Sequence, residues 1–284
     1  MAMKLALVAL VALLSLNGCV GDETGTIHFT TRGAAHVEDG IPAGEGGFVD
    51  GWAVTFDKFL VNFHQLQVAR SSGEIAETAP ASYFVDNVVP GTKPLISFRD
   101  VTAKTWDRVS YQIKPAASNA VVVAGDPDDL AMMVSAGYSL YVSGSASRAD
   151  VSKGFAFGFT TATHYDHCRD AGDGSSAGIV VLDGVEHERE LTIQADHLFY
   201  DRIPGAPGAA PPALRFDALA AADDAGDGDG WITLDELAAA PLDAEQYDTG
   251  ELSLADLSEL LGELSRLVGH FRGQGECRPV DVSR

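Results

Sequence analysis

The residues of this chain best suited to chemistry lie in the segment Asp223–Leu237, which reads DDAGDGDGWITLDEL. Asp227 and Asp229 alternate with glycines, and Glu236 follows seven residues after Asp229. Alternating carboxylates, a glycine for a sharp turn and a later glutamate give the oxygen donors and the spacing that a Ca²⁺ loop needs. Trp231 would contribute only its backbone carbonyl, so its side chain is no obstacle. The segment therefore predicts one calcium site.

This segment resembles the loop of the EF-hand family, in which oxygen ligands stand at positions one, three, five, seven, nine and twelve. When Gly230 is placed at position six, Asp227 and Asp229 fall at positions three and five. Thr233 then falls at position nine, where a ligand acts through water, and Glu236 falls at position twelve. The resemblance implies that Glu236 is the bidentate ligand.

The first position of the loop departs from the family pattern, because it falls on Ala225, which has no side-chain oxygen. The helix before the loop is predicted to bury one apolar face, formed by Phe216, Leu219 and Ala220. In EF-hands such residues lie eight, five and four positions before the first ligand. That count selects Asp224 as the first ligand, with one inserted residue, and leaves Asp223 as a substitute.

A second, degenerate loop follows twenty residues later, where Gly250–Leu257 repeats the pattern of Gly230–Leu237. Its ligand positions have lost most of their carboxylates and hold Glu245, Tyr247, Thr249 and Asp256. Because EF-hands work in pairs, Ile232 and Leu252 are predicted to form a short β-bridge between the two loops. We expect this second loop to be a structural partner that binds calcium weakly or not at all.

The alternative is an acidic helical pair without metal, since Asp- and Gly-rich loops also form plain turns. The charge of the segment favours calcium. Fourteen acidic residues and no Lys or Arg lie between Asp217 and Glu263. Such a density of like charge is costly in a compact segment unless a cation offsets it.

Histidines supply a second candidate site. His164 and His167 lie three residues apart beside Cys168, and imidazole suits Cu or Zn. His197 and His270 could approach the same loop if the chain folds back on itself. The alternative hypothesis is therefore a copper- or zinc-binding site formed by these four histidines.

The N-terminus predicts export and a lipid anchor. Lys4 precedes the apolar run Leu5–Leu16, which is too short to span a bilayer and is typical of a signal peptide. The run ends in Leu-Asn-Gly-Cys19, which resembles the lipobox of bacterial lipoproteins. This resemblance implies cleavage after residue 18 and lipidation of Cys19. The expected location is the bacterial cell envelope, on the periplasmic side or at the cell surface.

The remaining cysteines, Cys168 and Cys277, form an even pair in an oxidising compartment, so we expect a disulfide between them. The formal net charge of −22 argues against nucleic acid as a partner. The membrane, reached through the lipid, is the one partner that the sequence indicates. It identifies no protein partner.

Nine short runs rich in β-branched and aromatic residues lie between residues 26 and 202, separated by turn residues. Alternation within them, as in Val109, Tyr111 and Ile113, predicts antiparallel sheets with one buried face. One helix is expected at Pro127–Ala136, with Asp126 as its N-cap. The pattern favours a β-sandwich.

This β-domain is also similar to the periplasmic copper-binding β-proteins associated with methanobactin uptake. The features that carry the similarity are the strands Gly137–Val142 and Phe155–His164, then Cys168, then the segment Asp196–Phe199. The similarity implies a sandwich and a metal near His164.

No nucleophile elbow, zinc-protease helix, phosphate loop or dinucleotide fingerprint occurs, and we expect no enzyme activity. The expected fold is mainly β, with an antiparallel β-sandwich followed by a small helical, degenerate EF-hand pair. Its parts are a signal peptide (1–18), an anchor and spacer (19–25), the sandwich (26–202), a linker (203–211), the helical segment (212–272) and a tail (273–284).

Overall fold

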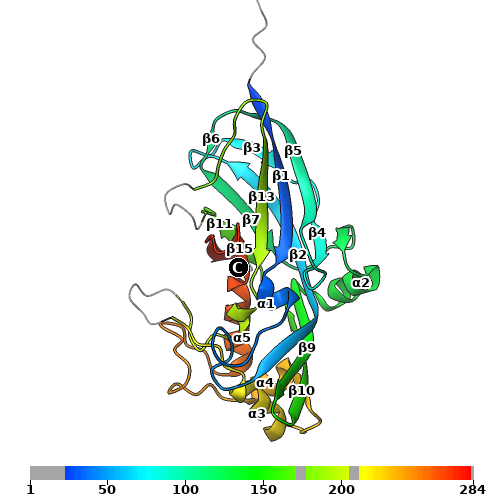
Figure 1. The fold of residues 1–284 in the computed structure, drawn as a ribbon, viewed down its shortest axis with the longest axis vertical. Helices are drawn as coiled ribbons and strands as arrows, with labels where there is room; N and C mark the ends of the chain where they lie inside the picture. Colours follow the sequence, from blue (N-terminus) through cyan, green and yellow to red (C-terminus); the bar gives the residue numbers. More distant parts are fainter. Residues whose placement is uncertain (1–22, 171–176, 205–210, 283–284) are drawn as a thin grey trace, which may run out of the picture.

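The computed structural model describes residues 23–170, 177–204 and 211–282. The predicted signal peptide, Cys19 and the spacer up to residue 22 lie outside the described residues, as do residues 205–210 of the predicted linker. In Figure 1 the described part is elongated, and the described chain begins at one end of the long axis. No helix in the described ranges combines the length and the apolar character that spanning a bilayer requires.

The smaller main sheet has four strands in the order β15-β13-β1-β5. Their bounds are Thr24–Gly33 for β1, Lys93–Thr102 for β5, Glu186–Ile193 for β13 and Gly269–Phe271 for β15. β1 is antiparallel to β5 but parallel to β13. The mainly β fold is confirmed, but its sheets are mixed rather than antiparallel throughout. Side-chain alternation reveals which face of a strand is buried and does not reveal which way its neighbour runs.

The larger sheet has ten strands, and its main path is β14-β10-β9-β2-β7-β11-β16. Along that path the bounds are Trp231–Thr233 (β14), Val151–Phe159 (β10), Leu140–Arg148 (β9), Ala53–Ala69 (β2), Arg108–Ile113 (β7), Thr163–Asp166 (β11) and Arg278–Asp281 (β16). Beside β2 lie β3 (Ile75–Thr78), β4 (Tyr83–Asp86) and β8 (Val121–Ala124). A separate pair joins β6 (Thr105–Trp106) to β12 (Ile179–Val180).

One hydrophobic core joins the two main sheets. The inward side chains of β7 that alternation predicted, Val109, Tyr111 and Ile113, are all buried. They belong to the same cluster as Ile27 of β1 and Leu191 of β13. The buried faces therefore meet, as the predicted sandwich requires.

Helix α2 (Pro127–Ala136) has the predicted bounds. The side chain of Asp126 accepts a hydrogen bond from the amide of Asp128 at its N-terminus. Gly137 ends the helix with a φ of +72°, a conformation that glycine adopts without strain. α2 covers a small second cluster on the other face of the large sheet, formed by Leu60, Phe84, Leu130 and Met133. Two further short helical segments are α1 (Ala35–Glu38) and η1 (Asp196–Phe199).

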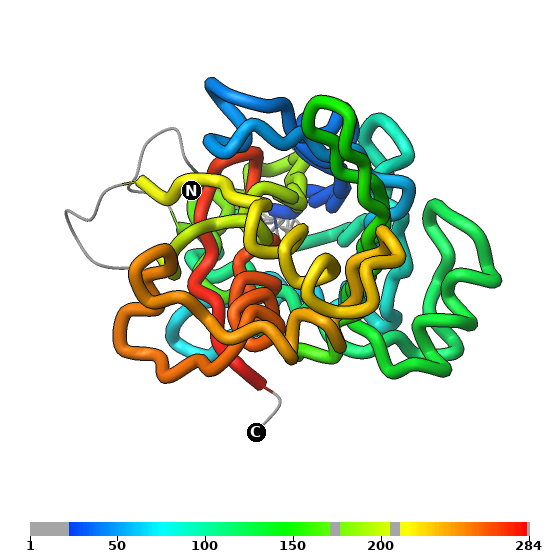
Figure 2. Tube along the Cα trace, turned by 90° about the horizontal axis from the view of Figure 1, so that it is seen from below, coloured from blue at the N-terminus to red at the C-terminus, as the bar shows by residue number. Residues whose placement is uncertain are grey.

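The C-terminal helical segment contains α3 (Asp217–Ala225), α4 (Leu234–Ala239), α5 (Leu257–Leu264) and η2 (Ser265–Leu267). It lies at the end of the molecule opposite the start of β1 (Figure 1), and Figure 2 views the molecule from that end. The predicted bridge between Ile232 and Leu252 is wrong. Ile232 pairs instead with Phe155 of β10, in parallel, while Leu252 lies outside any strand. The open edge of β10 offers a longer set of backbone partners than the degenerate loop does.

The Cys168–Cys277 disulfide is present and confirms the expected pairing. It joins the segment after β11 to the segment before β16, which pairs with β11 as the last strand of the large sheet. The chain end is thereby attached to the sheet covalently and through backbone hydrogen bonds.

Candidate calcium site

Helix α3 positions the acidic loop. Its predicted apolar face is buried, with Phe216, Leu219 and Ala220 between 0 and 4 % exposed. The carboxylate of Asp50 caps the start of the helix by accepting hydrogen bonds from the amides of Phe216 (2.6 Å) and Asp217 (2.9 Å). Asp50 is distant from α3 in the sequence, so these hydrogen bonds fix the start of the helix to another part of the chain.

Asp223 lies at the C-terminal end of α3 and is fully buried. Its Oδ1 accepts a hydrogen bond from the amide of Gly230 (3.2 Å), and its carbonyl accepts one from the amide of Gly228 (3.0 Å). Gly228 and Gly230 have φ values of +64° and +84°, in the left-handed region that glycine favours. The loop therefore closes around the Asp223 side chain.

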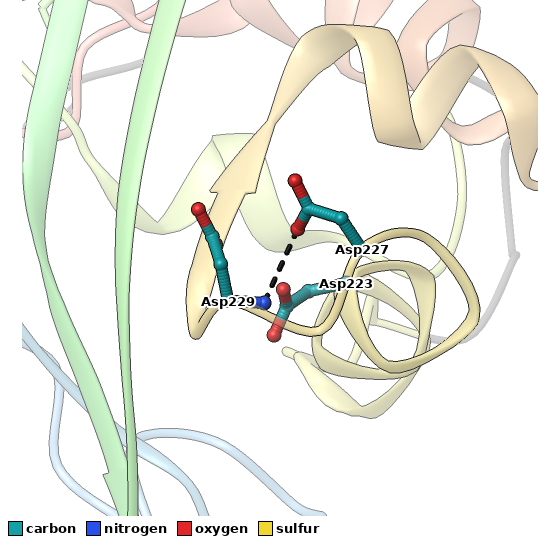
Figure 3. Close-up of side chains that lie close together, drawn as sticks. All are labelled: Asp223, Asp227 and Asp229. Carbon is teal, nitrogen blue, oxygen red and sulfur yellow. Dashed lines mark hydrogen bonds between the residues drawn. The ribbon is translucent and has the colours of Figure 1, made fainter.

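Two further carboxylates complete the cluster. Figure 3 shows the side chains of Asp223, Asp227 and Asp229 close together. One ligand atom from each lies within 4.8 Å of the other two. Oδ1 of Asp227 accepts a hydrogen bond from the amide of Asp229 (3.2 Å), and Oδ1 of Asp229 accepts one from the amide of Trp231 (2.8 Å). Each of these two carboxylates keeps oxygen lone pairs exposed to solvent. In the described residues this is the one group of three or more Asp, Glu, His or Cys close enough to hold a metal.

Asp224, which the sequence predicted as the first ligand, lies outside this cluster. Its side chain is 70 % exposed and pairs with Lys153 of β10 (Oδ1 to Nζ, 2.7 Å). Asp223, the predicted substitute, lies beside Asp227 and Asp229.

Lys153 contacts the acidic cluster, a contact that the sequence did not predict. Its side chain is 7 % exposed, and its Nζ contacts the carboxylate of the fully buried Asp223 as well as that of Asp224. Burial lowers the pKa of Lys153, but the hydrogen bonds that its ammonium donates to the carboxylates of Asp223 and Asp224 outweigh this effect, so the pKa is raised and the ammonium stays charged. The burial of Lys153 could have been predicted from its position two residues before the inward-facing Phe155, because side chains two residues apart in a strand face the same side.

Glu236 lies near the cluster without joining it. Its Oε2 accepts hydrogen bonds from the amide (2.8 Å) and the hydroxyl (2.9 Å) of Thr233, in the predicted capping box. Its Oε1 is buried against Gly226 and has no hydrogen-bond partner among the described residues. A buried carboxylate oxygen without a donor is costly, so Oε1 is available to a cation.

Trp231 begins strand β14, and its ring lies directly on Gly154 of β10. A Cβ atom on Gly154 would approach ring carbon Cε3 to 2.0 Å, so this contact requires glycine. The amide of Gly154 donates to the carbonyl of Gly230 (2.8 Å). Since successive carbonyls of a strand point to opposite sides, the Trp231 carbonyl points away from β10. It is therefore not used in that pairing.

The second loop brings no such group together. Tyr247 is buried with 4 % exposure, and the Asp256 side chain accepts from the amide of Glu259 as the N-cap of α5. In the described structure, Tyr247 thus contributes to the core and Asp256 to the start of α5.

The four predicted histidines form two pairs. Nδ1 of His197 lies 3.4 Å from Nε2 of His270 and 2.8 Å from the carbonyl of Leu267. His164 lies in β11 and His167 directly follows Asp166, the last residue of that strand, with Nδ1 of His167 3.1 Å from Asp166 Oδ2. Among the described residues, no three of the four approach closely enough to share an ion.

Burial favours the neutral form of three of these imidazoles. It lowers the pKa of His164 and His197, and it lowers the pKa of His270 to about 4. Cys168 is in the disulfide, so its sulfur is not a free thiolate ligand.

No protein-family model, curated protein or solved structure matches this chain. The geometry of the described residues is therefore the basis for a proposed function.

Proposed function

We propose that this protein is an exported, lipid-anchored calcium-binding protein, in which the loop Asp223–Glu236 holds one Ca²⁺. The observation that carries the proposal is the approach of three carboxylates, one of them fully buried, at the end of α3. Ca²⁺ accepts irregular cages of six to eight oxygens, which suits a loop with an insertion better than the strict octahedron of Mg²⁺ would.

The ligands in this proposal are Asp223, Asp227, Asp229, the Trp231 carbonyl and Glu236. The unpartnered Oε1 of Glu236 supports its inclusion, because a side-chain rotation would exchange a buried orphan oxygen for a metal bond. Thr233 would act through water, as its position nine in the loop implies. When calcium binds beside Asp223, the Lys153 ammonium would pair with Asp224.

The ion would neutralise the acidic segment and hold β14 against β10. Calcium bound only by the folded chain stabilises it by mass action, by about 2.7 kcal/mol at a hundredfold excess over the dissociation constant. A signalling role would need the helices to open on binding, and a single competent loop makes that the weaker hypothesis. Cys19 would attach the protein to a membrane of the bacterial cell envelope through its lipid.

Calorimetric titration of residues 21–284, stripped of metal, tests the proposal. We expect one Ca²⁺ per chain, with binding lost in Asp227→Asn and weakened at least tenfold in Glu236→Gln. Asp235→Asn is the matched control, because Asp235 is an exposed acid on the same helical turn and lies outside the cluster. Absence of binding at millimolar Ca²⁺ would refute the proposal.

A parallel titration with Cu²⁺ separates the alternative copper or zinc hypothesis. Tight copper binding that disappears on replacing His164 and His167 by alanine, with no calcium binding, would transfer the function to the histidines. The separation of the four histidines into two pairs supports calcium instead.

A further inference from the structure

An exposed aliphatic turn lies at the end of the molecule where the described chain begins. Val180, Leu182 and Val185 are 49, 54 and 39 % exposed, within six residues of one another. We call these three side chains the aliphatic tip. In Figure 1 the turn between β12 and β13 crosses over the start of β1 at this end.

The aliphatic tip is held on β1 by its backbone. The carbonyl of Thr24 accepts from the amide of Gly184 (2.8 Å), and the carbonyl of Val185 accepts from the amide of Thr26 (3.0 Å). Gly25 lies beneath the turn with no room for a side chain, since a Cβ atom there would come within 2.5 Å of the Leu182 carbonyl. These contacts fix the exposed side chains relative to the first residues of the described chain.

The distance from the aliphatic tip to the predicted lipid is limited by the chain. Four residue steps separate Cys19 from Glu23, which precedes β1. At about 3.5 Å for each residue, a fully extended chain of that length spans roughly 14 Å. A lipid on Cys19 would therefore hold the start of β1, and the turn packed on it, at the surface of the bilayer.

We propose that the aliphatic tip inserts into the headgroup region of the membrane that carries the lipid on Cys19. This inference rests on the lipid anchor of the proposed function and does not depend on calcium. Exposed aliphatic side chains gain free energy by leaving water, and the anchor already supplies the proximity. The tip thus sets the orientation of the domain.

The charged side chains near the aliphatic tip indicate which kind of lipid surface the tip would contact. The Asp183 carboxylate in the same turn accepts from the amide of Thr24 (3.1 Å), and Glu23 adjoins it. Lys104 lies at the same end, since its carbonyl accepts a hydrogen bond from the amide of Val181 (3.0 Å). Its Nζ lies 4.3 Å from the centre of the Trp106 ring and pairs with Glu74. Because acids surround the tip and the chain carries −22, a zwitterionic surface rich in phosphatidylethanolamine fits better than an anionic one.

The orientation that follows places the calcium loop away from the membrane. α3 and α4 lie at the end of the long axis opposite β1 (Figure 1), and they face the viewer in Figure 2. The acidic segment would then extend into the aqueous phase, where dissolved Ca²⁺ reaches it.

The test uses the full-length chain, purified after expression in a bacterium and incorporated into phosphatidylethanolamine vesicles containing a minor fraction of phosphatidylglycerol. Intact mass first establishes whether Cys19 carries a diacylglycerol. A single environment-sensitive NBD fluorophore is attached at Leu182→Cys, and the matched control carries it at Leu252→Cys, which is also exposed but lies in the acidic segment. Headgroup-nitroxide lipids serve as the quencher.

We expect at least twofold quenching at position 182 and none at position 252. Equal, weak quenching at both positions in a chain with the diacylglycerol attached would overturn the inference and leave the anchor intact. A mass without the lipid would overturn the anchor, and the inference with it. Calcium binding, measured separately by calorimetry, would be unaffected by either result.

Discussion

Replacing Lys153 by methionine tests whether the acidic loop is built for a cation. Methionine keeps much of the length of the side chain and removes its charge. Lys153 is 7 % exposed and Asp223 is fully buried, so the variant leaves a buried carboxylate without its cation. Removing one partner of a buried ion pair costs about 3–5 kcal/mol. For a chain of this size that loss lowers the melting temperature by roughly 10 °C in the absence of calcium.

Calcium should reverse this effect. An ion between Asp223, Asp227 and Asp229 would lie close to the Lys153 ammonium, which contacts the same Asp223 carboxylate. Two unit charges about 4 Å apart interact by about 4 kcal/mol at a partly exposed site. Relief of even a third of that repulsion tightens the dissociation constant about tenfold. Lys153→Met is therefore expected to melt lower without calcium, to bind calcium more tightly, and to gain more stability from it than the wild type does.

Scanning calorimetry with and without Ca²⁺, combined with titration, measures both effects. Lys58→Met is the matched control, because Lys58 lies on β2 of the same sheet, forms an ion pair with Asp129 of α2, and has a side chain that is 41 % exposed. We expect this control to lose at most about 1 kcal/mol and to bind calcium normally. The double variant Lys153→Met with Asp223→Asn should recover stability and lose calcium binding. Unchanged or weaker calcium affinity in Lys153→Met would refute the placement of the ion beside Asp223.

Three further predictions concern packing, the disulfide and pH. Gly154→Ala forces the Trp231 ring off the strand and should cost about 1–3 kcal/mol, with a red shift in tryptophan emission; an unchanged spectrum would contradict the contact. Cys277→Ser removes the link to Cys168 across 109 residues and should cost about 2–5 kcal/mol in denaturant unfolding, with reduction of the wild type as the control. The burial-lowered pKa of His270, about 4, predicts stability that is present above pH 6.5 and lost as the pH falls toward 4, by up to roughly 3 kcal/mol. A pH series of melting temperatures in which His270→Gln shows the same acid loss would rule that residue out as the source.

The predictions that the structure confirms relied on residues that lie close together in the sequence. Helix α2 has the expected bounds because its capping aspartate, its first-position proline and the following glycine all act within one turn of its ends. The buried face of α3 followed from helical spacing, and the buried rows of β7 and β10 followed from alternation. The disulfide followed from counting cysteines in an oxidising compartment.

The errors came from contacts between distant parts of the chain. Strand β2 (Ala53–Ala69) is longer than the short runs expected from the sequence, because a register shift between Phe56 and Lys58 lets the strand continue through the polar residues there. The sequences of β1 and β13, taken separately, do not indicate that the two strands pair in parallel. The partner of Ile232 proved to be Phe155, 77 residues earlier, which family resemblance could not indicate.

The pairing of β14 with β10 has a consequence for solubility. β10 contains the sequence Gly-Phe-Ala-Phe-Gly-Phe, and β14 covers its edge from Gly154 to Ala156 at the end of the large sheet. An uncovered edge of this composition is a template for strands from other molecules. If calcium holds β14 in place, its removal would expose that edge, and self-association would follow before global unfolding. Under the calcium hypothesis, the ion therefore protects the protein from aggregation as well as stabilising its fold.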